Sequence, residues 1–192
     1  MEFTGRKADI FREAARLMRA NGYAGTSMRD IASALSIEAA SLYNHVASKE
    51  DILKEICFSM GDAFNRALQE VNDIYFNAEE RLGMAVRAHI RLLTENLDAG
   101  HVFLHEWRHL GDPALSQFKK LRDDYEAAFR NILRSGEDEG VFHEVDHKFA
   151  VLTILSSLNW VVEWYRPDGG MSPDEIAERL SRFILTGLSK QH

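Results

Sequence analysis

The sequence of 192 residues predicts an all-α fold, and three observations support that prediction. Apolar residues recur at spacings of three and four along most of the chain, the period of a helix with one buried face. Proline occurs only three times, and no segment alternates apolar and polar residues between turns as a half-buried strand does. Hydrophobic residues make up 45% and charged residues 28%, which is typical of a globular protein of one or two domains.

The helical spacing predicts nine helices. The first spans about residues 3–20 and ends at Asn21-Gly22, where glycine permits a left-handed backbone. Two short helices within 27–46 come next, and a long helix over 49–75 follows them. Five more are expected at about 78–98, 101–110, 114–136, 145–165 and 172–187. The last has the clearest start, because Ser172-Pro173-Asp174-Glu175 places a capping serine, a first-turn proline and a glutamate in order.

Residues 22–53 predict two short helices joined by a tight corner. Ser27 and Asp30 have the spacing of a capping box, and Ser48 and Asp51 repeat it where the long helix begins. Helices this short bury too little apolar surface to be stable alone, so they must pack on neighbours. One use of this geometry is to place the second helix in a DNA major groove.

A set of residues in this segment has the identities and the spacing of a known DNA-binding domain: Gly22-Tyr23, Thr26-Ser27, Ile31-Ala32, Leu42-Tyr43, His45-Val46 and Ser48-Lys49-Glu50. On these residues the segment resembles the N-terminal DNA-binding domain of the TetR family of transcriptional repressors. The sequence departs from the family's pattern at Ser36, which replaces a glycine, at Asn44, which replaces an aromatic residue, and at Glu38. The resemblance implies a three-helix helix-turn-helix domain over 1–48 and a six-helix effector-binding and dimerisation domain over 49–192, connected through the helix 49–75.

The second short helix carries the side chains expected to meet double-stranded operator DNA: Ser41, Tyr43, Asn44 and His45. Ser41 and Asn44 are expected at base edges, because asparagine pairs with adenine N6 and N7. The resemblance places Tyr43 and His45 at phosphates or at the edge of the groove. Tyr43 has an alternative, which is to pack beneath the first helix.

The distribution of charge predicts few phosphate contacts per chain. Residues 1–54 contain eight basic and seven acidic residues, so the net charge of −7 arises in the remainder. Arg29 and Lys49, each near the start of a helix, are expected to bind phosphates, although both could be solvated surface charges. A symmetric dimer on a palindromic operator would double these contacts.

The C-terminal part is expected to bind a small apolar or amphipathic effector. Its segments His105-Glu106-Trp107-Arg108 and Trp164-Tyr165-Arg166-Pro167 resemble the TetR subgroup that often responds to fatty acids or acyl-CoA thioesters. Large apolar side chains with polar groups among them suggest a chamber, although each is also compatible with the plain core of a helical bundle. The candidates are Phe64, Leu68, His89, Leu93, Phe103, Trp107, Phe118, Leu121, Arg122, Tyr125, Phe129, Leu158 and Trp160, with His105, Ile154 and Asn159 beside them.

The last two helices are apolar around too much of their circumference to be covered by one contact within the chain. Two such helices from each of two chains would form a four-helix interface, as the resemblance also implies. The homodimer would present its recognition helices to successive major grooves, about 34–36 Å apart. The expected interface residues are Leu155, Val162, Ile176, Leu180, Phe183 and Ile184.

His101, His105 and His109 are spaced four residues apart, so adjacent pairs could chelate a metal. No cysteine or second carboxylate accompanies them at a recognisable ligand spacing, so scattered surface or pocket histidines are the preferred interpretation. The sequence also lacks the glycine-serine elbow, the phosphate-binding loop and the zinc-binding helix motif of common enzymes. We therefore expect no enzymatic activity, no cofactor and no metal.

Cys57 is the one cysteine, which excludes a disulfide within the chain and fits a reducing cytoplasm. No secretory signal and no membrane segment are expected. The sequence thus predicts a cytoplasmic, homodimeric, ligand-responsive repressor that leaves its operator when an effector binds. A metal-responsive repressor and a dimeric helical co-regulator that acts through protein contacts are the alternatives.

Overall fold

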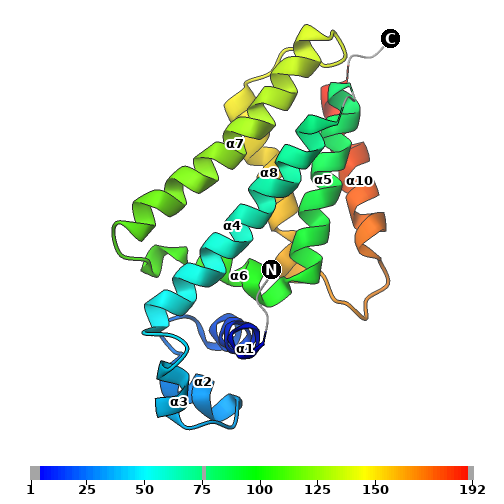
Figure 1. The fold of residues 1–192 in the computed structure, drawn as a ribbon. Coiled ribbons are helices and arrows are strands. Elements are labelled where there is room, and N and C mark those ends of the chain that lie inside the picture. Colours follow the sequence, from blue (N-terminus) through cyan, green and yellow to red (C-terminus); the bar gives the residue numbers. More distant parts are fainter. Residues whose placement is uncertain (1–4, 75–76, 190–192) are drawn as a thin grey trace. The chain divides into compact units, whose positions relative to one another are not determined.

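The computed structural model describes residues 5–74 and 77–189, and every regular element in them is a helix (Figure 1). The all-α prediction is therefore confirmed. The contacts divide the chain into two compact units. The first unit contains Met1–Asp62 and Asn96–Lys120, and the second contains Ala63–Glu95 and Leu121–His192.

The first unit is built around α1, which buries Ile10, Phe11 and Met18 on one face. α1 ends at Gly22, whose φ of +74° is a left-handed conformation that a side chain would strain, and the Gly22 N–H donates to the Met18 carbonyl oxygen at 2.9 Å. The helices of this unit are α1 (Arg6–Asn21), α2 (Met28–Ala34), α3 (Ala39–Tyr43), α6 (Leu97–His105), the 3-10 helix η1 (Trp107–His109) and the first parts of α4 (Lys49–Asp73) and α7 (Ala114–Asp138).

In the second unit α5 and α10 run side by side (Figure 1). α10 begins with the predicted capping box: Ser172 Oγ accepts from the Glu175 N–H, and the Glu175 carboxylate accepts from the Ser172 N–H at 2.7 Å. The bond from the Ser172 N–H, and then a second bond from the Ser172 hydroxyl at 2.9 Å, lower the pKa of the Glu175 carboxyl. The helices of this unit are α5 (Ala78–Glu95), α8 (His147–Asn159), α9 (Val161–Trp164), α10 (Pro173–Leu188) and the remaining parts of α4 and α7.

Two predicted helices differ from the structure in their continuity. The helix expected over 145–165 is interrupted at Trp160, which separates α8 from α9. The helix expected over 101–110 begins earlier, at Leu97, and leaves the α-helical conformation after His105. Phe3 and Tyr75, at the predicted ends of the first and fourth helices, lie outside the described residues. Within 5–74 and 77–189, no helix combines the length and the apolar character needed to cross a membrane.

Candidate functional site

The corner between α2 and α3 is fixed by a cap and by an unusual backbone conformation. Asp30 accepts from the Ser27 N–H at 2.8 Å and Ser27 Oγ accepts from the Asp30 N–H at 3.2 Å, so the predicted capping box is present. The Ser27 hydroxyl also donates to the Asp30 carboxylate at 2.6 Å, and this bond, followed by the bond from the Ser27 N–H, lowers the pKa of Asp30. Ser36 has a φ of +54°, so it adopts the left-handed backbone of the glycine that it replaces.

α3 separates its apolar and polar side chains cleanly. Leu42 is fully buried and Val46, just beyond the helix, is nearly so. Ser41, Asn44 and His45 are exposed, and 54% of Tyr43 is accessible to solvent. Tyr43 therefore does not pack beneath the first helix, which was the alternative interpretation. The polar side chains of α3 are available to a macromolecule that approaches from the solvent.

The two predicted phosphate-binding cations have different surroundings. Arg29 is exposed on the first turn of α2. Lys49 is half-buried: its Nζ donates to the carbonyl oxygens of Tyr23 and Thr26, at 2.7 Å each, and lies 4.1 Å from the centre of the Tyr23 ring. Lys49 thus closes the loop before α2 within the protein. Its phosphate contact remains a prediction, with at most one N–H still to offer.

α6 and the residues that follow it are tied to the helix-turn-helix segment by three polar contacts within the first unit. Arg19 on α1 pairs with Asp98 at 3.0 Å. The Tyr23 N–H donates to Glu106 at 3.1 Å, and the Gly111 N–H donates to the Glu50 carboxylate at 2.9 Å. The sequence analysis did not find these contacts, because each joins residues at least 61 positions apart.

The second unit contains a polar cluster of the buried His89 and Tyr125 and the half-buried Asn159, which we call the polar trio. His89 Nε2 lies 3.1 Å from Asn159 Oδ1, and His89 Nδ1 lies 3.0 Å from the Tyr125 hydroxyl. Because Oδ1 can only accept, Nε2 carries the proton and Nδ1 accepts from Tyr125. The Phe64 ring stacks on the His89 ring with centroids 4.6 Å apart. The trio is thus a satisfied polar group inside an apolar wall.

Burial keeps the polar trio uncharged. Removal from water lowers the pKa of His89 to about 4, opposed weakly by its hydrogen bond to Asn159. Burial also raises the pKa of Tyr125. At neutral pH the trio therefore offers hydrogen-bonding groups without a formal charge. In the first unit, burial and then the charge of Glu106 raise the pKa of the Cys57 thiol to about 12, so the thiol stays protonated at neutral pH.

The predicted chamber residues are divided between the two units. Phe103, Trp107 and Phe118 belong to the first unit, where Phe118 lies 5.4 Å from Phe103 and 5.9 Å from Trp107 between ring centroids. Trp160 is 64% exposed, which corrects its expected place in an inner wall. In the second unit, Leu121 and Arg122 are half-buried, and the buried candidates are Phe64, Leu68, His89, Leu93, Tyr125, Phe129 and Leu158.

The predicted interface residues are also divided. Val162 and Ile176 are buried in the single chain, which corrects their expected place on an outer face. Leu155 and Ile184 are nearly buried, but Ile184 lines a groove between α8 and α10, so its place in the interface remains a prediction. Leu180 is half-buried, whereas 77% of Phe183 is exposed.

Phe183 borders an apolar groove of about 890 Å³ between α8 and α10. Phe149, which also lines this groove, is 71% exposed, and Leu152 on α8 is exposed as well. Phe149 and Leu152 were not among the predicted interface residues, because helical spacing alone does not say which apolar side chains of α8 face outward.

Comparison with known proteins places both parts of the chain in one family. Residues 10–56 match the model of bacterial regulatory proteins of the tetR family, and residues 76–188 match the tetracyclin repressor-like C-terminal domain. The chain is 27% identical to the HTH-type transcriptional repressor KstR2 of Rhodococcus jostii (strain RHA1), over 98% of this chain and 94% of that protein.

Two solved structures support the same placement. The TetR family transcriptional regulator PfmR from Thermus thermophilus is 37% identical, with a TM-score of 0.86 over 94% of this chain and 99% of that chain. AibR, solved in complex with isovaleryl coenzyme A and operator DNA, is 29% identical, with a TM-score of 0.83 over 93% and 97%. KstR2 is a transcriptional repressor and PfmR a transcriptional regulator, and AibR binds operator DNA. The chain therefore belongs to the TetR family of ligand-responsive transcriptional regulators, with a helix-turn-helix DNA-binding domain and a ligand-binding C-terminal domain.

Proposed function

We propose that this chain is a homodimeric repressor that leaves a palindromic operator when an amphipathic acyl compound binds its second unit. The observation that carries the proposal is the separation on α3, where Tyr43, Asn44 and His45 are exposed above the buried Leu42. A helix with one buried side chain as its anchor and a polar outer side suits insertion into a major groove. In this proposal Asn44 and Ser41 meet base edges, and Arg29, Tyr43 and His45 meet the backbone.

The proposed effector site is the apolar surrounding of the polar trio. Phe64 and Phe129 pack near Tyr125 with ring centroids 5.7 and 5.3 Å away, so an acyl chain there would lose its water. The trio is neutral at pH 7, so its hydrogen bonds suit the carbonyl group of a thioester better than a carboxylate. AibR, a similar protein, was solved with a short acyl-CoA, which supports the thioester class.

The proposed dimer uses the outer faces of α8 and α10. Phe149, Leu152 and Phe183 would each lose exposed apolar surface when a second copy covers the groove. Exposed apolar side chains that gather on one face mark sites of protein association. Two copies related by a two-fold axis would then present two α3 helices to one operator.

Release of DNA requires that the effector bind better to a form whose α3 helices are wrongly placed for the operator. The shift in DNA affinity equals that difference in effector affinity and no more. In this proposal α4 carries the change, because it contributes residues to both units. Within the first unit, the bond from the Tyr23 N–H to Glu106, which follows α6, ties the loop before α2 to this part of the chain.

A titration with acyl compounds of increasing length tests this function. Each buried methylene contributes roughly 0.8 kcal/mol, so affinity should rise about fourfold per added carbon until the site is full. Acyl-CoA thioesters and the free acids of the same length form the two arms, followed by calorimetry and by release of a labelled operator selected from random DNA. Parallel gains in affinity and in DNA release support the proposal. Affinity that is constant along both series would exclude a buried acyl chain.

A further inference from the structure

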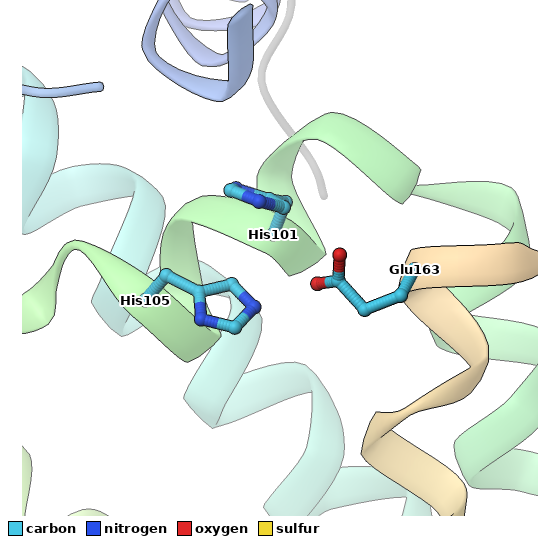
Figure 2. Close-up of side chains that lie close together, drawn as sticks. All are labelled: His101, His105 and Glu163. Carbon is cyan, nitrogen blue, oxygen red and sulfur yellow. The ribbon is translucent and has the colours of Figure 1, made fainter. Parts of the chain in front are cut away.

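α6 holds two histidines on one side of a single helical turn. His101 and His105 are four residues apart, and their ring centroids lie 4.5 Å from each other with 44° between the ring planes (Figure 2). His101 is half-buried and His105, in the last turn of the helix, is exposed to solvent. An ion from solution can therefore reach the pair at its His105 side.

The third histidine of the sequence pattern is directed elsewhere. His109 follows His105 by the same four residues, but α6 ends at His105 and His109 closes η1, where three residues make a turn. Its ring stacks on Tyr23, with centroids 4.8 Å apart and 22° between the planes, and its Nε2 lies 3.5 Å from Glu106. The equal spacing in the sequence thus gives one convergent pair and not a row of three.

We propose that His101 and His105 form a bidentate site for a divalent transition-metal ion such as Zn²⁺ or Cu²⁺. Imidazole nitrogen is a preferred ligand of these ions, and two histidines at positions i and i+4 of a helix reach one ion together. Two protein ligands leave the other coordination positions to water or to small anions. The pair shares no residue with the set proposed above to meet DNA or with the polar trio.

The position of the pair gives a bound ion a structural consequence. α6 packs on α1, and Asp98 in the first turn of α6 pairs with Arg19. An ion held by His101 and His105 joins two successive turns of this helix and binds only when the helix is formed. By mass action the folded protein therefore gains stability as the free ion concentration rises above the dissociation constant.

The test uses the full-length protein with Cu²⁺ and Zn²⁺ as probes. Electron paramagnetic resonance of the Cu²⁺ complex should show splitting from two imidazole nitrogens, and calorimetry with Zn²⁺ should give one site per chain. His105→Gln and His101→Gln should each weaken binding by at least about tenfold and leave at most one coupled nitrogen.

His109→Gln is the matched control, because it removes a histidine at the same sequence spacing from outside the pair. It should bind Zn²⁺ as the unchanged protein does. His105 is exposed, so His105→Gln should keep the helical circular dichroism spectrum and isolate the loss of the ligand. Undiminished binding by folded His105→Gln would overturn the proposal, and so would an equal loss in all three variants.

Discussion

The two units place polar and apolar side chains in opposite ways. The first unit exposes polar groups on α3 and buries Leu42 beneath them. The second unit buries a polar trio and exposes Phe149 and Phe183. An exposed polar row is stable in water, whereas exposed aromatic rings are not the arrangement that a single chain in water favours.

The different exposure of polar and apolar side chains indicates which binding partner each unit requires. The polar side chains on α3 are solvated when no DNA is bound. Their exposure therefore does not lower the stability of the free protein. The rings on α8 and α10 gain free energy only when a second apolar surface covers them. The polar trio is already satisfied inside the protein, so any effector must compete with hydrogen bonds that exist.

The largest effect is expected from Phe183→Glu, which puts a charge on the apolar face. Burial of an unpaired carboxylate is so unfavourable that the dimer dissociation constant should rise at least about a hundredfold, or the protein should aggregate. Sedimentation velocity measures the change. Phe183→Leu, which keeps the face apolar, should remain dimeric. If Phe183→Glu sediments as a stable dimer, the interface lies elsewhere.

The next largest effect is expected from the pH dependence of stability. The pKa of His89 is about 4 in the folded chain and ordinarily 6.5. Between these values the unfolded chain binds a proton that the folded chain does not, so the free energy of unfolding falls as the pH is lowered. The slope should be about 1.4 kcal/mol per pH unit across this window, and the contribution is complete above pH 6.5.

Urea unfolding at pH 7, 6 and 5 compares the unchanged protein with His89→Gln. The variant has no titrating group at this position. Its free energy of unfolding should therefore change less steeply with pH, by about the 1.4 kcal/mol per pH unit that His89 contributes. Equal slopes for the two proteins would mean that His89 is not buried in its neutral form.

In the exposed polar surface of the first unit, Asn44→Ala should relax the base preference at one position in each half-site of the operator. The expected cost is about 1–3 kcal/mol per contact. Arg29→Ala is the matched variant: it should weaken binding to all DNA sequences alike and reduce the salt dependence of binding. Competition gel shifts with single-base operator variants measure both. An unaltered base preference in Asn44→Ala would remove Asn44 from base recognition.

Lys49→Met tests whether the Lys49 ammonium group mainly stabilises the fold or mainly binds a DNA phosphate. The variant keeps the apolar stem but removes the donor to the carbonyl oxygens of Tyr23 and Thr26, so the protein should lose about 1–2 kcal/mol of stability. Lys54→Met, on an exposed position of the same helix, should change stability little. If Lys49→Met leaves urea unfolding unchanged and only flattens the salt dependence of DNA binding, phosphate contact is its main role.

The smallest effect is expected at the corner before α3. Ser36 adopts a φ of +54°, where a residue with a Cβ is strained, so Ser36→Gly should stabilise the protein by about 0.5–1 kcal/mol. Ser33→Gly, within α2, should destabilise it by a similar amount, because glycine in a helix loses more backbone entropy. Thermal unfolding of both variants checks the two signs.

Local chemistry made much of this protein predictable. The capping boxes at Ser27 and Ser172 and the helical spacing of apolar residues depend on neighbours within a few positions, so the sequence alone determines them. The family resemblance of 22–53 has the same basis, because a short segment with fixed spacing carries it. The exposure of Tyr43, Asn44 and His45 likewise depends on local helical spacing, which turns Leu42 inward and these side chains outward.

The tertiary structure decided which apolar and polar residues meet. Trp160, Val162 and Ile176 have similar sequence patterns, yet the first is exposed and the other two are buried, since the rotation of each helix depends on its packing partners. The ties from Lys49 and Glu106 to the loop before α2 join distant parts of the chain, and spacing cannot specify them. His101, His105 and His109 are equally spaced in the sequence, but the change from α6 to the tighter η1 turns the third away. Sequence periodicity sets the conformation of each segment, and the direction of a side chain is set by the neighbours against which the segment packs.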